Sequence, residues 1–206
     1  EAIFDAMERK ETYATTGSRM AVRMFGGWEF TAADLNNREP AFAGYSKGVP
    51  MGSELPPKGK NKAPSFMIIA LRDPIGANLD RVQVIKGWLD AKGQKQEKIY
   101  EVIWGDADSR KIDSKGKLPA VGNTVNMETL EVSNSIGDSE LKTVWTDPDF
   151  DPSQPAFYYV RVLEIPTPRW TAWDAMRYKI KMDPSVPMTI QERCYGSPIW
   201  YTPVNL

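Results

Sequence analysis

From Ser65 to the end of the chain, short β-rich segments alternate with turns, and this alternation restricts the fold more than any other feature. The segments are dense in β-branched and aromatic residues, and clusters of Gly, Pro and Asp separate them. No helical pattern is interleaved with them, so the strands are expected to pair antiparallel. About seven to nine strands in this order predict a mainly β fold, an antiparallel β-sandwich of the immunoglobulin-like or fibronectin-like kind.

Individual segments predict particular strands. The strongest is AFYYVRVLEI at 156–165, and the segments 80–88 and 97–104 flank a polar turn as in a hairpin. Further strands are predicted at 20–25, where Gly26 and Gly27 are expected to end the strand, and at 65–74, 124–132 and 140–145. Two short strands, broken at 196–198, are expected to close the chain.

The chain divides into three parts. Residues 1–30 predict a helix and short strands, with Ile3, Phe4 and Met7 on one face of the helix and the first strand ending at Gly17. Residues 31–62 are rich in turn signals and predict a long surface connection, with one helical turn near TAADL. Residues 63–206 form the predicted β-sandwich domain.

The composition excludes several functional classes. The chain has 26 Lys+Arg and 27 Asp+Glu residues, and this balance predicts neither a nucleic-acid nor a membrane partner. It contains no histidine, so a Ser–His–Asp triad, a Cys–His pair and a His-based zinc site cannot form within it. Its single cysteine, Cys194, cannot form an internal disulfide. Carboxylate chemistry and calcium binding stay open.

Three alternating carboxylates form a weak calcium candidate. Asp147, Asp149 and Asp151 could converge on a cation if their loop curled around it. The EF-hand pattern is excluded because Pro152 and Tyr158 occupy its sixth and twelfth positions. The alternative, which we favour, is that these residues initiate turns, since Asp before Pro is typical of turns.

Two further segments carry candidate binding residues. Arg169, Trp170 and Trp173 follow two prolines that favour an extended path, and they could stack on a sugar ring or pack the loop onto a neighbouring domain. The segment TTGSR, at 15–19, could face an anion through its hydroxyl and backbone N–H groups. A plain turn between two strands is the alternative for that segment.

Several long motifs together resemble a known family. They are EAIFDAMERKETYATTGSRMAVRMFGGW, PMGSELP, LRDPIGANLDRVQVIKGW, VWTDPDFDPSQPAFYYVRVLEIPTPRW and QERCYGSPIWYTP. These stretches resemble the C-terminal part of the bacterial domain-of-unknown-function family numbered 3604. That family is similar to the polymerase-and-histidinol-phosphatase type of metallohydrolase, in which a (β/α) barrel carries a metal cluster at one end.

The resemblance implies an expected function. Residues 1–17 would be the last helix and strand of a barrel whose earlier part precedes this chain, and Thr15, Thr16, Gly17 and Arg19 would lie near the mouth of that barrel. The divalent metal would belong to that preceding part, so this chain is expected to have no cofactor and no activity alone. The expected partner is the barrel domain, and a homodimer in a crystal and a periplasmic or secreted location stay open. The alternative function is a sandwich that binds carbohydrate or another partner.

Overall fold

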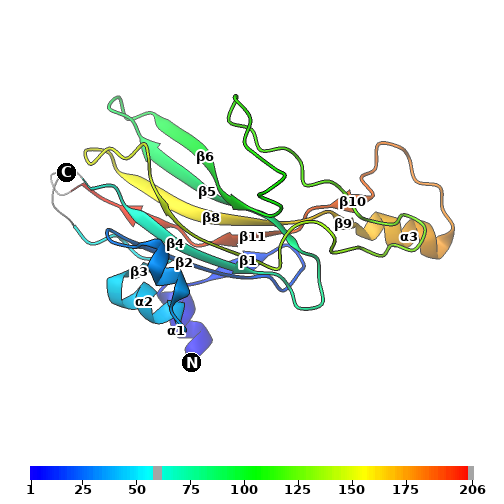
Figure 1. Ribbon diagram of the computed structural model, residues 1–206, viewed down its shortest axis with the longest axis horizontal. Coiled ribbons are helices and arrows are strands. Elements are labelled where there is room, and N and C mark those ends of the chain that lie inside the picture. Colours follow the sequence, from blue (N-terminus) through cyan, green and yellow to red (C-terminus); the bar gives the residue numbers. More distant parts are fainter. Residues whose placement is uncertain (58–61, 204–206) are drawn as a thin grey trace.

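The larger of two main sheets has six antiparallel strands. The computed structural model describes residues 1–57 and 62–203. The strand order is β1 (Tyr13–Thr15), β11 (Arg193–Gly196), β8 (Ala156–Glu164), β5 (Leu79–Leu89) and β6 (Lys95–Trp104), as Figure 1 shows. The last strand, β12 (Ile199–Tyr201), pairs with β8 on the same side as β11, because the chain breaks its pairing at Ser197 and Pro198.

The second sheet has four antiparallel strands, and short elements surround both sheets. Its order is β3 (Gly48–Pro50), β2 (Ala21–Gly27), β4 (Ser65–Leu71) and β7 (Glu140–Thr146). Strands β9 (Thr167–Pro168) and β10 (Thr189–Ile190) form a separate two-stranded ribbon. The helices are α1 (Ala2–Glu8), the 3-10 helix η1 (Ala32–Asn36), α2 (Pro40–Lys47) and α3 (Trp170–Tyr178).

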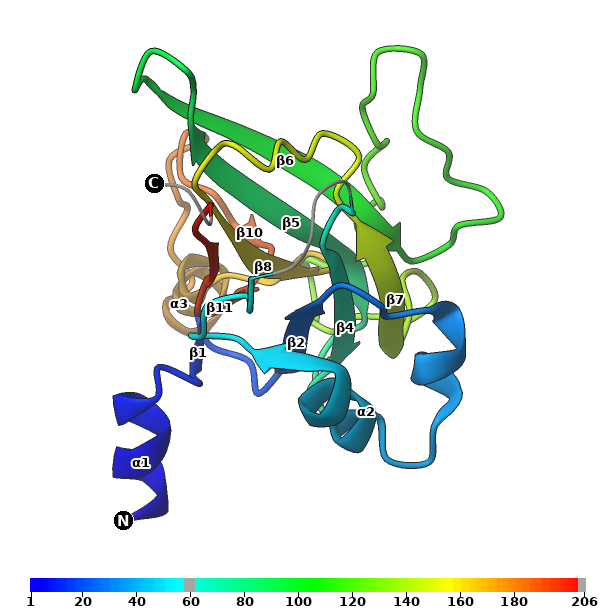
Figure 2. The ribbon, with the colours of Figure 1, turned by 90° about the vertical axis from the view of Figure 1, so that its left-hand side faces the viewer.

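The two main sheets pack against one another over a shared core. In β8 every second residue is buried, so Tyr158, Val160 and Val162 face the second sheet. Their partners include Phe66 and Ile68 of β4, and the Phe66 and Tyr158 rings lie 4.5 Å apart between centroids. Figure 2 shows the sheet of β5, β6 and β8 above the sheet of β2, β4 and β7. The fold is therefore mainly β and antiparallel, as predicted.

The hairpin and the closing strands are present as the sequence predicted, but β2 does not end before its two glycines. β5 and β6 pair antiparallel, and β8 covers nearly all of its predicted range. The strand β2 runs through Gly26 and Gly27, where the sequence predicted its end. A Cβ atom on Gly27 would lie 2.9 Å from the Lys47 carbonyl oxygen, so Gly27 serves the close approach of the junction between α2 and β3 rather than a turn.

The region predicted as a loop-rich connection contains regular structure. The helical turn near TAADL is present as η1, but α2 and β3 follow it where only loop was expected. Pro40 begins α2, as proline favours the first turn of a helix, and the missing side chain of Gly44 lets that helix lie against the Phe25 ring. Residues 58–61 of the predicted connection lie outside the described residues.

Two other segments differ from their predictions. Residues 124–132 do not form a strand; only an isolated bridge joins Val125 to Val132 within the loop 105–139. Arg110 fixes this loop by donating to the carbonyl oxygens of Gly105 and Pro119 and to the Asp80 carboxylate, at 2.9, 2.9 and 2.7 Å. The extended path predicted by the two prolines ends at Pro168, and the residues after it form α3 instead.

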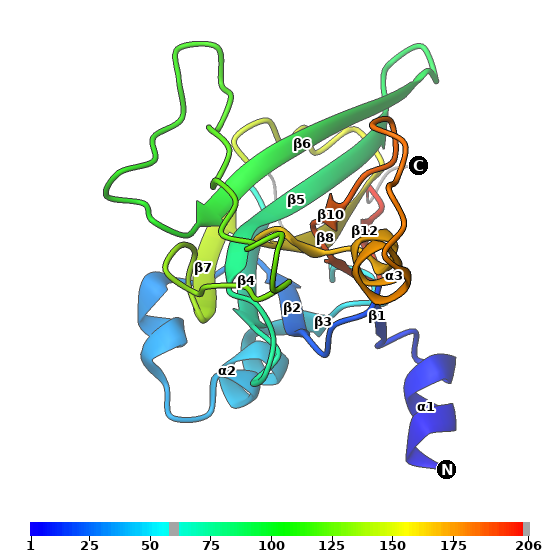
Figure 3. The ribbon, with the colours of Figure 1, turned by 90° about the vertical axis from the view of Figure 1, so that its right-hand side faces the viewer.

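Within residues 1–30, helix α1 and strand β2 differ in how they contact the two main sheets. Strand β2 lies inside the four-stranded sheet and pairs with β4, so strands from both sides of residue 30 share a sheet. Helix α1 contains no buried residue, and Figures 2 and 3 show it projecting away from both sheets. The division of the chain into three parts stays a prediction.

Candidate functional site

The TTGSR segment joins the two sheets. Thr15 ends β1, and the next four residues lead toward β2. The Thr16 backbone N–H donates to the Arg193 carbonyl at 2.9 Å, and the Arg193 N–H donates to Thr16 Oγ1 at 2.9 Å. The Thr16 hydroxyl in turn donates to the Glu192 carboxylate. These bonds attach the segment to the residues that begin β11.

Carboxylates surround this segment. A Cβ atom on Gly17 would lie 3.5 Å from the Glu192 carboxyl carbon. The Arg19 backbone N–H donates to Asp73 Oδ2 at 2.8 Å. The sequence analysis expected the segment 15–19 to face an anion and Thr15, Thr16, Gly17 and Arg19 to lie near the mouth of a barrel. The Glu192 and Asp73 carboxylates accept hydrogen bonds from this segment, and both expectations stay predictions.

A buried glutamate that the sequence reasoning missed lies at the same end. Glu164 is 1% exposed, and its Oε1 atom has no hydrogen-bond partner among the described residues. Burial, together with the smaller effects of the Glu192 and Asp73 carboxylates, raises its pKa to about 7. The nearby Ser18 hydroxyl opposes this shift, although its Oγ atom also lacks a partner in hydrogen-bonding geometry. Its position two residues after Val162, on the same face of the predicted strand, was the signal that could have identified this residue.

The three candidate residues at α3 form an exposed aromatic surface. Trp170 is 63% and Trp173 is 49% exposed, one turn apart on the helix. The Arg169 guanidinium carbon lies 5.7 Å from the centroid of the Trp170 ring. Thr171 and Ala172 are the buried residues of this helix. Figure 1 shows α3 and the β9–β10 ribbon at one end of the molecule.

The three aspartates of the calcium candidate have three separate sets of partners. Asp147 is buried and accepts bonds from Lys86 Nζ at 2.6 Å and from the Tyr158 hydroxyl at 2.8 Å. Asp149 instead pairs with Lys98 and Tyr100, and Asp151 caps the turn at Ser153. Within residues 1–57 and 62–203, no group of three His, Cys, Asp or Glu side chains could hold a metal ion.

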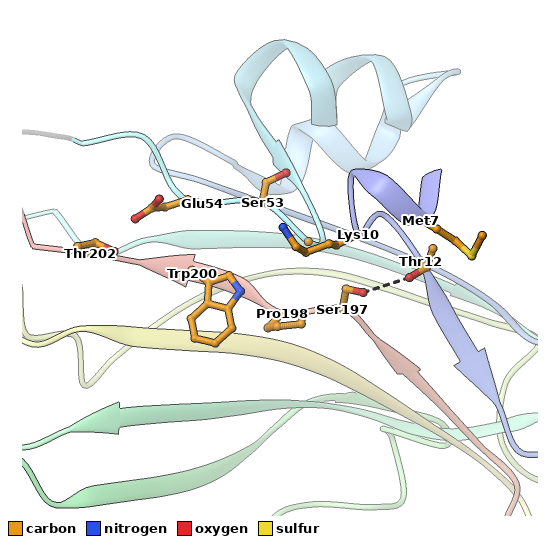
Figure 4. Close-up of a pocket in the computed structure, with 10 residues that line it drawn as sticks. Met7, Lys10, Thr12, Ser53, Glu54, Ser197, Pro198, Trp200 and Thr202 are labelled. Carbon is orange, nitrogen blue, oxygen red and sulfur yellow. Dashed lines mark hydrogen bonds between the residues drawn. The ribbon is translucent and has the colours of Figure 1, made fainter. Parts of the chain in front are cut away.

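A cavity of about 830 Å³ opens where the segment after α1 meets β12. Figure 4 shows Lys10, Ser53 and Trp200 around it, with Thr12 and Ser197 at one side. The hydroxyls of Thr12 and Ser197 lie 3.3 Å apart. The remaining lining residues are Met7, Gly52, Glu54, Pro198 and Thr202. Residues from three distant parts of the sequence therefore meet at one cavity.

Backbone contacts hold the segment after α1 against the body. Lys10 has φ of 57° and Gly52 has φ of 88°, and a Cβ atom on Gly52 would lie 2.2 Å from the Lys10 carbonyl oxygen. The Gly52 N–H donates to the Pro198 carbonyl at 2.9 Å, and the Ser197 N–H donates to the Thr12 carbonyl at 3.0 Å. Only glycine permits this approach at position 52.

Comparison with known proteins identifies a family. The family described as "Protein of unknown function (DUF3604)" matches residues 1–203. No curated protein and no solved structure matches the chain. A search of the described residues for a helix long and apolar enough to cross a membrane found none.

Proposed function

The chain belongs to the family of proteins of unknown function numbered DUF3604, and from this premise we propose that it is the non-catalytic C-terminal part of a metal-dependent hydrolase. Its two sheets would form an immunoglobulin-like or fibronectin-like sandwich that supports a preceding (β/α) barrel, of which α1 and β1 are the last elements. The residues of this chain do not fit the metal: it has no histidine, and its described acidic residues form no ligand cluster. The proposal therefore assigns the metal to the barrel.

One observation carries this proposal, the exposed apolar face of α1. Ile3, Phe4 and Met7 are 79%, 65% and 58% exposed, and α1 buries none of its residues against the body. Covering such a side chain contributes about 1.5–3 kcal/mol. A short helix with no buried face gains little stability by itself. A neighbouring domain that covers this face would account for the pattern.

The open edge of β1 supports the same proposal. β1 lies at the end of the six-stranded sheet, where β11 is its one partner strand among the described residues. A strand at the end of a sheet has unpaired backbone groups on its outer side. A further strand or loop of the preceding domain could pair there, next to Thr15 and Thr16.

The proposal predicts activity in the full-length protein and none in this chain alone. With divalent metal present, the full-length protein is expected to hydrolyse p-nitrophenyl phosphate, and the 206-residue chain is not. Ile3→Asp in the full-length protein is expected to lower the turnover several-fold and to lower the melting temperature, because a charge would enter the covered face. Phosphate release and differential scanning calorimetry measure both effects.

Ile75 provides the matched control. It is 91% exposed in a turn far from α1 in the sequence, so Ile75→Asp is expected to leave turnover and melting temperature unchanged. Turnover by the isolated chain would contradict the proposal, and so would an Ile3→Asp variant with unchanged behaviour. If light scattering shows that the chain is a dimer and that Ile3→Asp makes it monomeric, a second copy of the chain would cover the α1 face instead.

A second candidate function rests on the exposed aromatic surface of α3. We propose as the alternative that Trp170 and Trp173 bind carbohydrate or another partner. Two tryptophans exposed on one helix form an apolar surface of the kind that marks an interaction site. In a glycan array, Trp170→Ala and Trp173→Ala are expected to reduce binding by the chain at least about tenfold. Binding that is unaffected by both substitutions would exclude this surface.

A further inference from the structure

We infer that the cavity beside Trp200 binds a neutral pyranose sugar, with one ring stacked on the indole of Trp200. This inference does not depend on the proposed hydrolase function, because it uses only the cavity and its side chains. It also differs from the α3 surface in position, since Trp200 lies on β12 and the cavity is lined by the segment after α1.

The floor of the cavity is an exposed aromatic ring on a rigid strand. Trp200 is 47% exposed between the buried residues Ile199 and Tyr201, so the alternation of β12 points its ring away from the core. The Trp200 and Phe157 ring centroids lie 5.1 Å apart. Tyr159 continues the row at 6.4 Å from Phe157, with the two rings nearly parallel at 16°.

Gly87 makes room for this row of rings. A Cβ atom at position 87 would lie 2.3 Å from the Phe157 ring, so the ring lies over the β5 backbone. The position pairs directly with Phe157 across the sheet. The sheet therefore presents the Trp200, Phe157 and Tyr159 rings side by side, on the face that does not contact the second sheet. An array of this kind suits the apolar face of a sugar ring.

The rim of the cavity offers unused polar groups. The side chains of Lys10, Ser53 and Glu54 make no hydrogen bond or ion pair with any residue in the described part of the chain. The Trp200 indole N–H likewise has no partner there. An ammonium, a hydroxyl, a carboxylate and an indole N–H together supply both donors and acceptors. Sugar hydroxyls can use both kinds of group.

The charges on the rim favour a neutral ligand. Lys10 and Glu54 carry opposite charges, so their fields oppose one another and select neither an anion nor a cation. A purely apolar ligand would leave the polar groups of the rim without partners, which costs binding energy. The cavity volume of about 830 Å³ lies within the range of about 300–1,000 Å³ that small-molecule sites occupy.

The α3 surface is less suited to the same ligand. Arg169 lies over the Trp170 ring, and Arg177 lies 5.7 Å from the Tyr178 ring centroid. A guanidinium group therefore already contacts each of these two rings. Among the cation–aromatic contacts of the described residues, none involves Trp200. The Trp200 ring is therefore free for a ligand.

Titration calorimetry of the 206-residue chain with sugars tests the inference. The probes are cellotetraose, laminaritetraose and mannotetraose, and at least one of them is expected to bind. Trp200→Ala is expected to weaken that binding at least about tenfold, because the stacking surface is lost. The double substitution Ser53→Ala with Glu54→Ala is expected to weaken it several-fold. Saturation-transfer NMR is expected to show contact at the ring protons of the sugar.

Phe42 is the control, because its ring is 70% exposed on α2 and it does not line the cavity. Phe42→Ala is expected to leave sugar binding unchanged. Binding lost in Trp173→Ala and kept in Trp200→Ala would assign the sugar to α3 and overturn the inference. The absence of binding by all three probes would overturn it as well. If circular dichroism shows that Trp200→Ala is unfolded, the Ser53 and Glu54 double variant decides, and unchanged affinity there rejects the site.

Discussion

Replacing Asp147 with alanine is expected to lower the free energy of unfolding by about 3–5 kcal/mol. Asp147 follows β7 of one sheet, and its carboxylate accepts hydrogen bonds from Lys86 on β5 and Tyr158 on β8 of the other. Lys86 and Asp147 are 3% and 2% exposed, so the substitution leaves a buried ammonium without its counter-ion. Urea denaturation followed by circular dichroism measures the effect as a fall in the midpoint.

Asp149 is the control for this prediction because it lies two residues away in the same turn. Its pair with Lys98 has both side chains about half exposed, so Asp149→Ala is expected to cost less than about 1 kcal/mol. The double substitution Lys86→Met with Asp147→Leu removes both charges and is expected to recover most of the lost stability. Equal effects of Asp147→Ala and Asp149→Ala would refute a central role for the buried pair.

Replacing Glu164 with glutamine is expected to stabilise the protein above pH 7 and to leave it nearly unchanged at pH 4. The pKa of Glu164 is raised from 4.5 to about 7 in the folded protein, mainly by burial. Between these two values the folded state holds a proton that the unfolded state has lost, so stability falls as pH rises. A shift of this size corresponds to about 3 kcal/mol. Glutamine stays neutral and avoids this loss.

The measurement is the difference in unfolding free energy between Glu164→Gln and the parent chain, followed from pH 4 to pH 8. The difference is expected to grow through the range 4.5 to about 7 and then to stay constant. Glu140 supplies the control because it is exposed on β7 and pairs with Lys142. Glu140→Gln is expected to show no such growth. A flat curve for Glu164→Gln would show that its carboxyl ionises normally in the fold.

Local patterns in the sequence were sufficient to predict the long strands. They were not sufficient to predict close contacts that depend on glycine. The aromatic and β-branched residues of 156–165 and the polar turn between the segments 80–88 and 97–104 are local signals, and the strand and hairpin that they predict are present. Gly27 was predicted to end a strand and Gly44 lies in the predicted connection, yet each lies inside an element because a neighbouring backbone or ring occupies the space of its missing side chain. The sequence does not reveal such a neighbour.

The candidate sites were harder to predict from the sequence, because their residues are far apart in the chain. Thr16 meets Glu192 across a sequence separation of 176 residues, so no local motif could pair them. The exposure of Trp170 and Trp173 agrees with their selection as candidates, although a helix rather than an extended loop presents them. The cavity at Trp200 combines residues 7–12, 52–54 and 197–202, and only the folded chain brings these together.

The pairing of β1 with β11 sets the order in which parts of the larger sheet can form during protein synthesis. A ribosome makes residues 13–15 well before residues 193–196, and these two short strands are hydrogen-bonded partners. β1 can therefore join its sheet only after β11 has been made. Until then α1 and β1 stay available to any other folded part of the protein, which gives such a part earlier access to them than the sandwich has.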